Sequence, residues 1–430
     1  MRTNIGGIKH EQIVTVAGLV EKVRDTRYMV FVLLRDNSGM VQISLDKEHH
    51  KDLIEPSLEA IAGSFVEVTG KVNVTENVKS CGVEIVPQSY NVLSVAEASP
   101  IQVDNTSVDS LLQYRWLDLR SEKNILIFEI QTYLSHAMRL FLIERGFIEI
   151  HSPKLIGAAS ESGSEVFEVK YFDRTAYLAQ SPQFYKQMAM AAGFDKVFEC
   201  GPVFRAEQSF TNRHATEFTG FDIEISYIKS HEEVMAVHEQ MLAYALEAVH
   251  KKYNDRVKEV FGFEIVVPTL PFPRMDLSMI YKELEARYNF KPEDGDYGDL
   301  STEAERLVGK LSQDMFGHEF MFATGFKADK RAFYHMRDAN GIAMGYDLIW
   351  KNMEITTGAM REHRYDMLKS QAQEKGLGKD VEFYLDFFKY GCPPHGGFGM
   401  GLDRITMLLL NLTSIKEAMY IFRGPNRLFP

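Results

Sequence analysis

The sequence predicts a protein of the α+β class, with a small β-barrel at the N-terminus and a larger domain built around an antiparallel sheet flanked by helices. Short β-like runs fill the first hundred residues, whereas long amphipathic helices interrupt the strands beyond residue 125. Those helices occur irregularly between the strands, which is typical of α+β domains. At 430 residues the chain is also too long for one small hydrophobic core.

Five β-like runs define the barrel. They are "IVTVAGLVEKV", "YMVFVLLR", "MVQISL", "FVEVTGKVNV" and "VEIVPQSYNVL", and a polar helix-like interval separates the third from the fourth. This pattern is typical of an OB-type barrel, and other small barrels fit it nearly as well. We assign residues 1–100 to the barrel domain, residues 101–124 to a polar linker or hinge, and residues 125–430 to the second domain.

The second domain is expected to begin with a helix. Apolar residues recur at helical spacing from Ile125 to Glu144, and Gly146 ends that helix before the strand "FIEI". Further helices are predicted at "SPQFYKQMAMAAG" and "HEEVMAVHEQMLAYALEAVHKKY". Further strands are predicted at "EVFEV", "AYLA", "KVFEC", "FMFAT", "AFYHM", "IAMGYDLIW" and "MEITTG".

The composition limits the functional classes. A net charge of −12 argues against general polyanion binding, although a locally basic surface can still hold a nucleic acid. No apolar run approaches the roughly 18 residues that span a membrane, and the N-terminal segment lacks the apolar core of a secretion signal. Cys81, Cys200 and Cys392 lie far apart, as expected for reduced thiols. We therefore expect a cytoplasmic protein without a membrane partner.

Residues 204–218, "FRAEQSFTNRHATEF", concentrate charged side chains around a polar turn. β-like runs flank this segment, so two antiparallel strands joined by a loop are expected. Arg205 would lie on the first strand and Arg213 at the end of the loop. Both guanidinium groups would then converge on one concave face of the sheet, which is unusual for an ordinary surface hairpin.

A second segment, "GGFGMGLDRITMLLL", joins a glycine-rich strand to an apolar helix with Arg404 in its first turn. Glycines permit close backbone approach, and a helix N-terminus together with an arginine suits a phosphate group. The alternative interpretation is a joint in which the glycines serve packing, which is the more common use of such a sequence.

Two acidic residues occur close together in "YDLIWKNMEITTGAMREHR". Asp347 and Glu354 would lie on two strands joined by the turn "WKNM". If they face one cavity they can hold Mg²⁺, which prefers oxygen ligands and bridges nucleotide phosphates. The alternative, two solvated acids on strands, stays open.

Two shorter segments carry further polar candidates. "AQSPQFYKQ" presents Gln183 and Lys186 at a helix start, and its alternative interpretation is an amphipathic surface helix. "GAASESGSEVF" is a loop of small residues that holds Glu161, and it is either a mobile lid or a solvated turn.

Taken together and in order, these segments resemble the class II aminoacyl-tRNA synthetases. The specific matches are "RDNSGMVQI", "FIEIHSPKL", "LAQSPQFYKQ", "VFRAE", "RHATEF", "PPHGGFGMGLDR" and "RLFP". The finer resemblance is to aspartyl-tRNA synthetases of the shorter archaeal and eukaryotic type, and it runs from near Ala17 to Pro430. It implies a class II synthetase catalytic domain, an antiparallel sheet flanked by helices, preceded by an OB-fold β-barrel.

The resemblance implies a site for ATP, with Mg²⁺ as cofactor. Arg205, Glu207 and Arg404 would be catalytic: Arg205 on the α-phosphate, Glu207 on the adenine side and Arg404 on the γ-phosphate. Asp347 and Glu354 would hold the metal. The residues implied in ATP binding are Arg205, Ala206, Glu207, Arg213, His214, Ala215, Phe218, Glu354, Gly401, Leu402, Asp403 and Arg404.

The resemblance also implies a pocket for L-aspartate. Lys186 and Arg361 would meet the substrate side chain, and Glu161 would receive its ammonium group. Lys186 favours aspartate over asparagine because related asparaginyl enzymes lack a lysine there. Lys186→Met would then abolish aspartate activation and leave the fold intact. The residues implied in aspartate binding are Glu161, Gln183, Phe184, Tyr185, Lys186, Arg205, Thr357 and Arg361.

The barrel would read the anticodon of the RNA partner, tRNA(Asp). Phe31 would stack on a base, Gln42 would read the central uracil, and Glu84 would make a further contact. The alternative for Phe31 is a residue of the barrel core. Pro153, in "EIHSP", belongs to the motif that builds the homodimer interface of the family.

Three alternatives stay open after the resemblance. The chain could charge tRNA(Asn) in addition to tRNA(Asp), or it could be an asparaginyl enzyme. It could also be a tRNA-independent paralogue, such as an amide-forming ligase or a regulatory protein.

Overall fold

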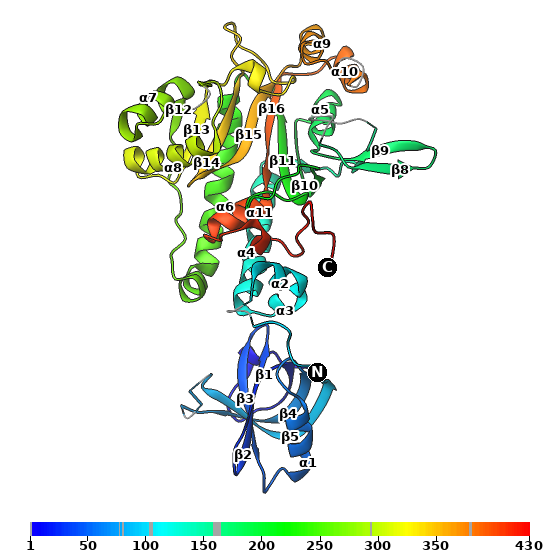
Figure 1. Cartoon of the computed structure of the whole chain (residues 1–430), viewed down its shortest axis with the longest axis vertical. Helices are drawn as coiled ribbons and strands as arrows, with labels where there is room; N and C mark the ends of the chain where they lie inside the picture. Colours follow the sequence, from blue (N-terminus) through cyan, green and yellow to red (C-terminus); the bar gives the residue numbers. More distant parts are fainter. Residues whose placement is uncertain are drawn as a thin grey trace. The chain divides into compact units, whose positions relative to one another are not determined.

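The structure, a computed structural model, describes residues 2–76, 78–79, 81–102, 106–157, 165–292, 295–377 and 381–430. The chain divides into two units, Met1–Asp118 and Leu119–Pro430 (Figure 1). The predicted class is confirmed, because a closed five-stranded barrel precedes a larger unit of sheet and helices. No helix among the described residues is long and apolar enough to cross a membrane.

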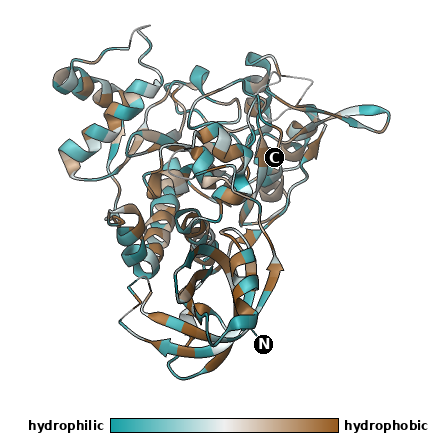
Figure 2. Cartoon of the chain, turned by 60° about the horizontal axis from the view of Figure 1, so that its bottom comes forward, coloured by the Kyte–Doolittle hydropathy of each residue, from teal (hydrophilic) through white to brown (hydrophobic). Residues whose placement is uncertain are grey.

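The strands of the first unit close into a barrel in the order β1-β2-β3-β5-β4. Along β2, Val30, Val32 and Leu34 are fully buried while the residues between them face outward. This period of two gives each strand one apolar face, and Figure 2 shows the resulting alternation of colours along the barrel strands. The elements are η1 (Ile5–Gly7), β1 (Ile13–Asp25), β2 (Met29–Asp36), β3 (Gly39–Asp46), α1 (Lys51–Glu59), β4 (Phe65–Val74), β5 (Val83–Ser94), α2 (Val108–Gln113) and α3 (Arg115–Asp118).

The predicted helix between the third and fourth strands is confirmed as α1, so the barrel has the OB-type order. The segment expected to be a linker, residues 101–124, is partly helical. Its described part contains α2 and α3, and it ends on the first turn of the next helix.

An eight-stranded sheet of order β12-β13-β14-β15-β16-β11-β10-β6 forms the centre of the second unit. Neighbouring strands are antiparallel except at the β6–β10 and β12–β13 pairs. A three-stranded sheet of order β7-β9-β8 stands beside it, and its β8–β9 hairpin projects outward (Figure 1). The strands are β6 (Ile148–Glu149), β7 (Leu155–Ile156), β8 (Glu168–Tyr171), β9 (Arg174–Leu178), β10 (Lys196–Phe204), β11 (Glu217–Ser226), β12 (Arg274–Asp276), β13 (Phe320–Thr324), β14 (Gly345–Trp350), β15 (Met353–Arg361) and β16 (His395–Gly401).

Two long helices, α4 and α6, pack against each other, and α6 also contacts β14, β15 and β16. The ring of His238, on α6, stacks on Phe398 of β16 at a centroid distance of 3.9 Å. The helices are α4 (Glu122–Ile143), α5 (Gln183–Ala191), α6 (His231–Phe261), α7 (Leu277–Tyr288), α8 (Thr302–Phe316), η3 (Ala328–Lys330), α9 (Tyr365–Glu374), α10 (Glu382–Lys389), α11 (Leu402–Leu409) and α12 (Ile415–Ala418).

One predicted strand is wrong. The segment "AFYHM", residues 332–336, makes an isolated bridge from His335 to Arg361 and forms no strand. Its apolar side chains are nevertheless buried, because Phe333 and Tyr334 belong to a cluster with α9 and α10. Burial without a strand ladder gives the same apolar sequence pattern, which explains the error. The sequence interpretation also missed α7, α8, α9 and α10.

Candidate active site

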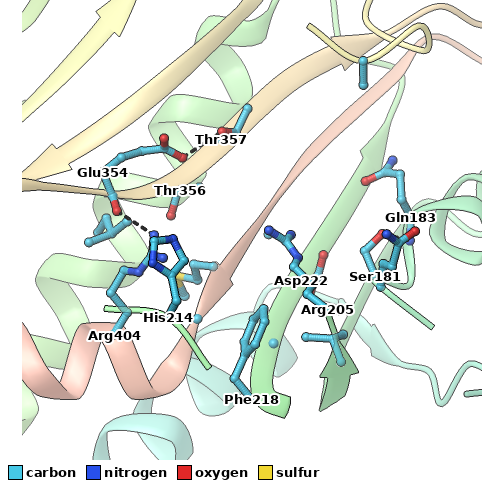
Figure 3. A pocket seen from close by; sticks show the side chains of 18 of the residues that line it. Ser181, Gln183, Arg205, His214, Phe218, Asp222, Glu354, Thr356, Thr357 and Arg404 are labelled. Carbon is cyan, nitrogen blue, oxygen red and sulfur yellow. Dashed lines mark hydrogen bonds between the residues drawn. The ribbon is translucent and has the colours of Figure 1, made fainter. Parts of the chain in front are cut away.

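A cavity of about 330 Å³ lies in the second unit and is lined by residues between Gln180 and Ile415. It brings together most of the residues proposed for ATP and for the amino acid. Those that line it are Gln183, Arg205, Glu207, Arg213, His214, Ala215, Phe218, Glu354, Thr357, Arg361, Gly401, Asp403 and Arg404. In Figure 3, Glu354, His214 and Arg404 gather on one side and Ser181 and Gln183 on the other, with Arg205 and Asp222 between them.

Six other candidates do not line the cavity. Phe184 packs instead in the hydrophobic cluster around Phe333 and Tyr384, where its ring stacks on Tyr384 at 4.2 Å. Glu161 lies outside the described residues. Besides Phe184, the described candidates that do not line the cavity are Tyr185, Lys186, Ala206, Asp347 and Leu402.

The hairpin of β10 and β11 carries one end of the cavity. The two strands pair from Lys196↔Ile225 to Phe204↔Glu217, and the backbone N–H of Arg205 then donates to Thr216 O at 2.9 Å. The Arg205 side chain is 44% exposed, and its guanidinium lies 5.6 Å from the centre of the Phe218 ring. The strand therefore ends with an arginine and an aromatic ring that both face the cavity.

Arg213 and Arg404 complete this end, which we call the arginine end. Arg404 donates to the main-chain oxygens of Glu354 at 3.0 Å and of Arg213 at 3.4 Å. Burial, together with the charges of Arg205 and Arg213, lowers the pKa of Arg404, although Glu354 opposes this shift. The positive charges of these three arginines repel one another, and an anionic ligand bound between them would reduce that repulsion.

His214 lies within the same end. Its Nδ1 is 3.0 Å from Ser209 Oγ, and burial together with the Arg404 charge lowers its pKa. The ring is therefore neutral at pH 7, so it can hydrogen-bond a ligand but adds no charge.

At the other end of the cavity, which we call the paired end, the charged side chains are already bonded to one another. Lys186 is fully buried, and its Nζ donates to Asp222 Oδ1 at 2.9 Å and to the main-chain oxygens of Ile223 and Phe398 at 3.3 and 3.2 Å. Asp222 lines the cavity and Lys186 does not. All three ammonium protons of Lys186 thus have protein acceptors.

Arg361 is committed in a similar way. Its Nε donates to Glu224 Oε1 at 3.0 Å, and its Nη2 donates to Gln183 Oε1 at 3.3 Å and to Gly397 O at 2.9 Å. Burial alone would raise the pKa of Glu224, but the charges of Arg361 and Lys186 outweigh it and lower that pKa. Both acids of β11 therefore neutralise the two cations proposed for the amino acid.

The glycines of β16 explain how these acids fit. A Cβ at Gly397 would come within 2.4 Å of Glu224 Oε2, and one at Gly399 within 2.5 Å of Asp222 Oδ1. At these two positions the glycines make room for β11, which is the packing role that the sequence left as an alternative. Arg404 nevertheless lines the cavity one turn beyond the strand.

The two candidate metal ligands are close enough to influence each other. Burial and the charge of Glu354 raise the pKa of Asp347 to about 7, against the opposing effect of Arg331. Arg331 Nη1 and Nη2 donate to the two oxygens of Asp347 at 2.8 and 2.7 Å, and Thr357 Oγ1 donates to Glu354 Oε1 at 2.9 Å.

The described residues contain no group of three or more His, Cys, Asp or Glu side chains that could hold a metal by themselves. Mg²⁺ is commonly held by one or two carboxylates together with substrate phosphates. Glu354 lines the cavity and fits that arrangement, whereas Asp347 does not line it and could join only by sharing the oxygens that accept from Arg331.

The three barrel candidates share one outer face. Phe31 and Ser44 are directly paired, as are Gln42 and Glu84, and Ser44 Oγ donates to Glu84 Oε2 at 2.7 Å. The inward neighbours of Phe31 are fully buried, so its interpretation as a core residue is wrong. The Arg24 guanidinium lies 4.6 Å from the centre of the Phe31 ring.

Sequence reasoning missed four residues near the cavity. Asp222 and Glu224 alternate with apolar residues in "FDIEI", a pattern that puts both acids on one face of a central strand and could have revealed them. Nothing in the sequence marked Arg331 or His335, because their segment has no regular structure.

Comparison with known proteins gives consistent matches to both units. Residues 107–422 match the family described as tRNA synthetases class II (D, K and N), and residues 14–93 match an OB-fold nucleic acid binding domain. The Aspartate--tRNA(Asp) ligase of Pyrococcus furiosus is 40% identical over 97% of this chain and 96% of its own. The Aspartate--tRNA(Asp/Asn) ligase of Methanopyrus kandleri is 41% identical over 97% and 96%.

Solved structures are similar over the whole chain. The asparaginyl-tRNA synthetase of Pyrococcus horikoshii complexed with asparaginyl-adenylate has a TM-score of 0.92 and 30% identity, and the match covers 100% of both chains. The aspartyl tRNA synthetase of Entamoeba histolytica has a TM-score of 0.89 and 32% identity, covering 100% of this chain and 93% of its own.

Proposed function

The chain belongs to the class II tRNA synthetases of the D, K and N group, and from this premise we propose that it activates L-aspartate with ATP and transfers the aspartyl group to tRNA. One observation carries the proposal. One cavity has arginines at one end and, at the other, Arg361 together with Asp222, behind which Lys186 is buried. The arginine end suits a nucleoside triphosphate, and the paired end suits a small charged amino acid.

In the first step the substrate carboxylate attacks the α-phosphorus, a new carboxyl–phosphate bond forms, and pyrophosphate leaves with the electrons of the broken bond. The reaction needs no nucleophilic side chain, so the protein contributes position and electrostatics. Arg205 stabilises the charge that develops at the α-phosphate, while Arg213, His214 and Arg404 hold the outer phosphates. Phe218 supports the adenine ring, and Glu207, Ala206 and Ala215 border it.

Gly401, Leu402 and Asp403 bring Arg404 to the phosphates. Asp403 accepts the backbone N–H of Thr219 at 3.0 Å and a Gln131 side-chain N–H at 3.2 Å, so it ties the start of α11 to β11 and α4. In this proposal Asp403 positions the helix start and does not touch the nucleotide.

Mg²⁺ would be held by Asp347 and Glu354 and would neutralise phosphate oxygens when bound. Arg331 occupies both oxygens of Asp347 in the described structure, so it would have to share that carboxylate with the ion.

For the amino acid, Gln183, Thr357 and Arg361 reach the cavity directly, and Glu161 would bind the ammonium group. Lys186 acts through Asp222 in this proposal, because its protons are already accepted by protein oxygens. Phe184 and Tyr185 belong to α5 itself, and Phe184 fixes that helix in the hydrophobic cluster around Phe333 and Tyr384.

A second candidate function is activation of L-asparagine. The observation that favours it is the charge balance of the paired end, where Lys186 and Arg361 are offset by Asp222 and Glu224. A site without net charge discriminates less strongly between a carboxylate and an amide.

The outer face of the barrel with Phe31, Gln42 and Glu84 would bind the anticodon. We propose tRNA(Asp) as the partner, with tRNA(Asn) as a second partner to be tested. We also propose a cytoplasmic homodimer. Three apolar residues close to Pro153 in the sequence, Ile143, Ile148 and Leu155, are 55%, 51% and 46% exposed, and exposed apolar side chains suit burial against a second copy.

The decisive experiment is ATP–pyrophosphate exchange with aspartate and, separately, with asparagine. Exchange that depends on aspartate supports the proposal, and exchange only with asparagine replaces it by the second candidate. Charging transcripts of both tRNAs with labelled aspartate then identifies the RNA partners. Light scattering after gel filtration gives the oligomeric state.

A further inference from the structure

His335 is a buried side chain in the cavity that the mechanism above does not use. It is 4% exposed and lines the cavity, and its Nδ1 atom is buried without a hydrogen-bond partner. Buried polar atoms in folded proteins nearly always have a partner, because an unpaired one loses its hydration without compensation. Nδ1 itself has almost no accessible surface and lies beside β14, where a Cβ at Gly345 would come within 3.5 Å of it, so the ring nitrogen that can reach a ligand in the cavity is Nε2.

The backbone fixes where this side chain lies. Met336 N donates to Met360 O and Glu362 N donates to Tyr334 O, so these two bonds bracket the pair His335 and Arg361. A pair of this kind has its side chains on the same face and close together. The imidazole of His335 is therefore the direct neighbour of the Arg361 guanidinium.

The hydrogen bonds around Arg361 show what this end of the cavity lacks. Arg361 uses its Nε and Nη2 on Glu224, Gln183 and Gly397. Lys186 uses its donors on Asp222 and on two main-chain oxygens. Of these two cations only Nη1 of Arg361 takes no part in these bonds, so a substrate side chain that enters here would meet that group and the neighbouring imidazole of His335.

The imidazole is neutral in the described structure. Burial and the charges of Arg361 and Arg331 lower the pKa of His335 well below its usual range. A neutral ring still donates one N–H, and it does so without adding a charge beside the two arginines.

We propose that His335 is a third recognition group for the side chain of the amino-acid substrate, and that it donates its imidazole N–H to the side-chain oxygen held by Arg361. The inference rests on the proposed function, since it presumes that an aspartate or asparagine side chain occupies the paired end. His335 is then a substrate-binding residue that raises the affinity for the amino acid and makes no contact with the phosphates of ATP.

The test compares His335→Leu with His335→Gln, whose amide can replace the ring donor at nearly the Nε2 position. In aspartate-dependent exchange, His335→Leu should raise the KM for aspartate about tenfold to a hundredfold, the usual loss for a hydrogen bond to a charged group. The KM for ATP should stay within about twofold. His335→Gln should recover most of the aspartate affinity, which a merely structural role would not predict.

The matched control is His231→Leu. His231 also has a buried Nδ1 without a partner, but it lies at the start of α6 and does not line the cavity. The control should leave both KM values unchanged. An aspartate KM for His335→Leu within about twofold of the wild type would overturn the inference.

A crystal structure of the unmodified chain with its amino acid tests the same contact if His335→Leu does not fold. A ring nitrogen of His335 within about 3.2 Å of the substrate side-chain oxygen supports the inference, and a separation beyond about 4 Å overturns it. Exchange with asparagine alone would refute the proposed function, and the structure with asparagine would still decide the role of His335. Without exchange with either amino acid, both proposals fail.

Discussion

The two ends of the cavity hold their positive charge in different ways. At the arginine end, the Arg205 side chain is 44% exposed, and Arg404 donates to main-chain carbonyl oxygens. At the paired end, the side chains of Lys186 and Arg361 are 0% and 4% exposed, and each is bonded to a buried carboxylate. Both ends contain ion pairs, but those of Arg205 with Glu207 and of Arg213 with Glu305 stay partly exposed, whereas those of Lys186 and Arg361 are almost fully buried.

This difference teaches that similar residues serve different purposes a few strands apart. An accessible cation next to other cations gains most from an anion that arrives with the substrate. A buried ion pair mainly fixes the shape of its surroundings, because removing one partner leaves the other charge desolvated. We therefore expect variants of the paired end to damage the fold, and variants of the arginine end to damage activity.

Lys186→Met should have the largest effect on stability. It leaves Asp222 and Glu224 buried with one cation fewer, and breaking a buried pair of this kind typically costs about 3–5 kcal/mol. Urea denaturation of the wild type and of Lys186→Met measures the loss in the free energy of unfolding. This replaces the sequence-based expectation that the variant keeps its fold intact, because Lys186 is fully buried and holds three protein acceptors.

The control is Lys251→Met, which removes an exposed ion pair with Glu247 on α6 and should change stability by less than about 0.5 kcal/mol. If Lys186→Met is as stable as this control, the ion pairs of the paired end do not stabilise the fold, and the stated difference between the two ends is wrong.

Arg205→Ala should show the reverse pattern. Removing one preorganised group from a transition-state charge costs about a hundredfold to a thousandfold in rate. The side chain is 44% exposed, so the melting temperature should hardly change. Pyrophosphate exchange and a thermal scan give both values. A loss below tenfold would show that Arg205 does not act on the reacting phosphate.

Phe218→Ala should act on one substrate only. A base stacked on an aromatic ring contributes about 1–3 kcal/mol, so the KM for ATP should rise about tenfold or more. The KM for aspartate should stay constant, because Phe218 borders the arginine end beside Arg205. Separate titrations of the two substrates sharpen the comparison, and equal changes in both KM values would contradict the division into two ends.

Gln42→Ala should have the smallest effect and should change the reaction at neither end of the cavity. Gln42 lies on the outer face of the barrel and donates to Ser44 Oγ at 3.1 Å. One lost contact to a base corresponds to about 1–3 kcal/mol, so the KM for tRNA should rise about tenfold. Exchange in the absence of tRNA should remain at the wild-type rate. A slower exchange reaction would mean that the barrel influences the catalytic cavity.

The sequence by itself determined the class of the fold and the arginine end. Alternation along the barrel strands, the β10–β11 hairpin and the joint from β16 to α11 are local patterns, and local patterns follow from a period of two, a polar turn or a glycine. The segments that carry Arg205, Arg213 and Arg404 could therefore be found without a structure. The false strand at residues 332–336 shows that burial without a ladder imitates a strand pattern, whereas the missed helix α7 has a regular helical period in its buried residues Leu277, Ile280, Tyr281 and Leu284, which could have revealed it.

Only the tertiary structure decided the paired end. Lys186 on α5, Asp222 on β11 and Arg361 on β15 come from distant parts of the chain, and no spacing rule connects them. Their bonds depend on which strands are neighbours and on the room that Gly399 leaves beside β11. His335 was invisible for the same reason, because an unsatisfied nitrogen becomes evident only when everything that packs around it is known.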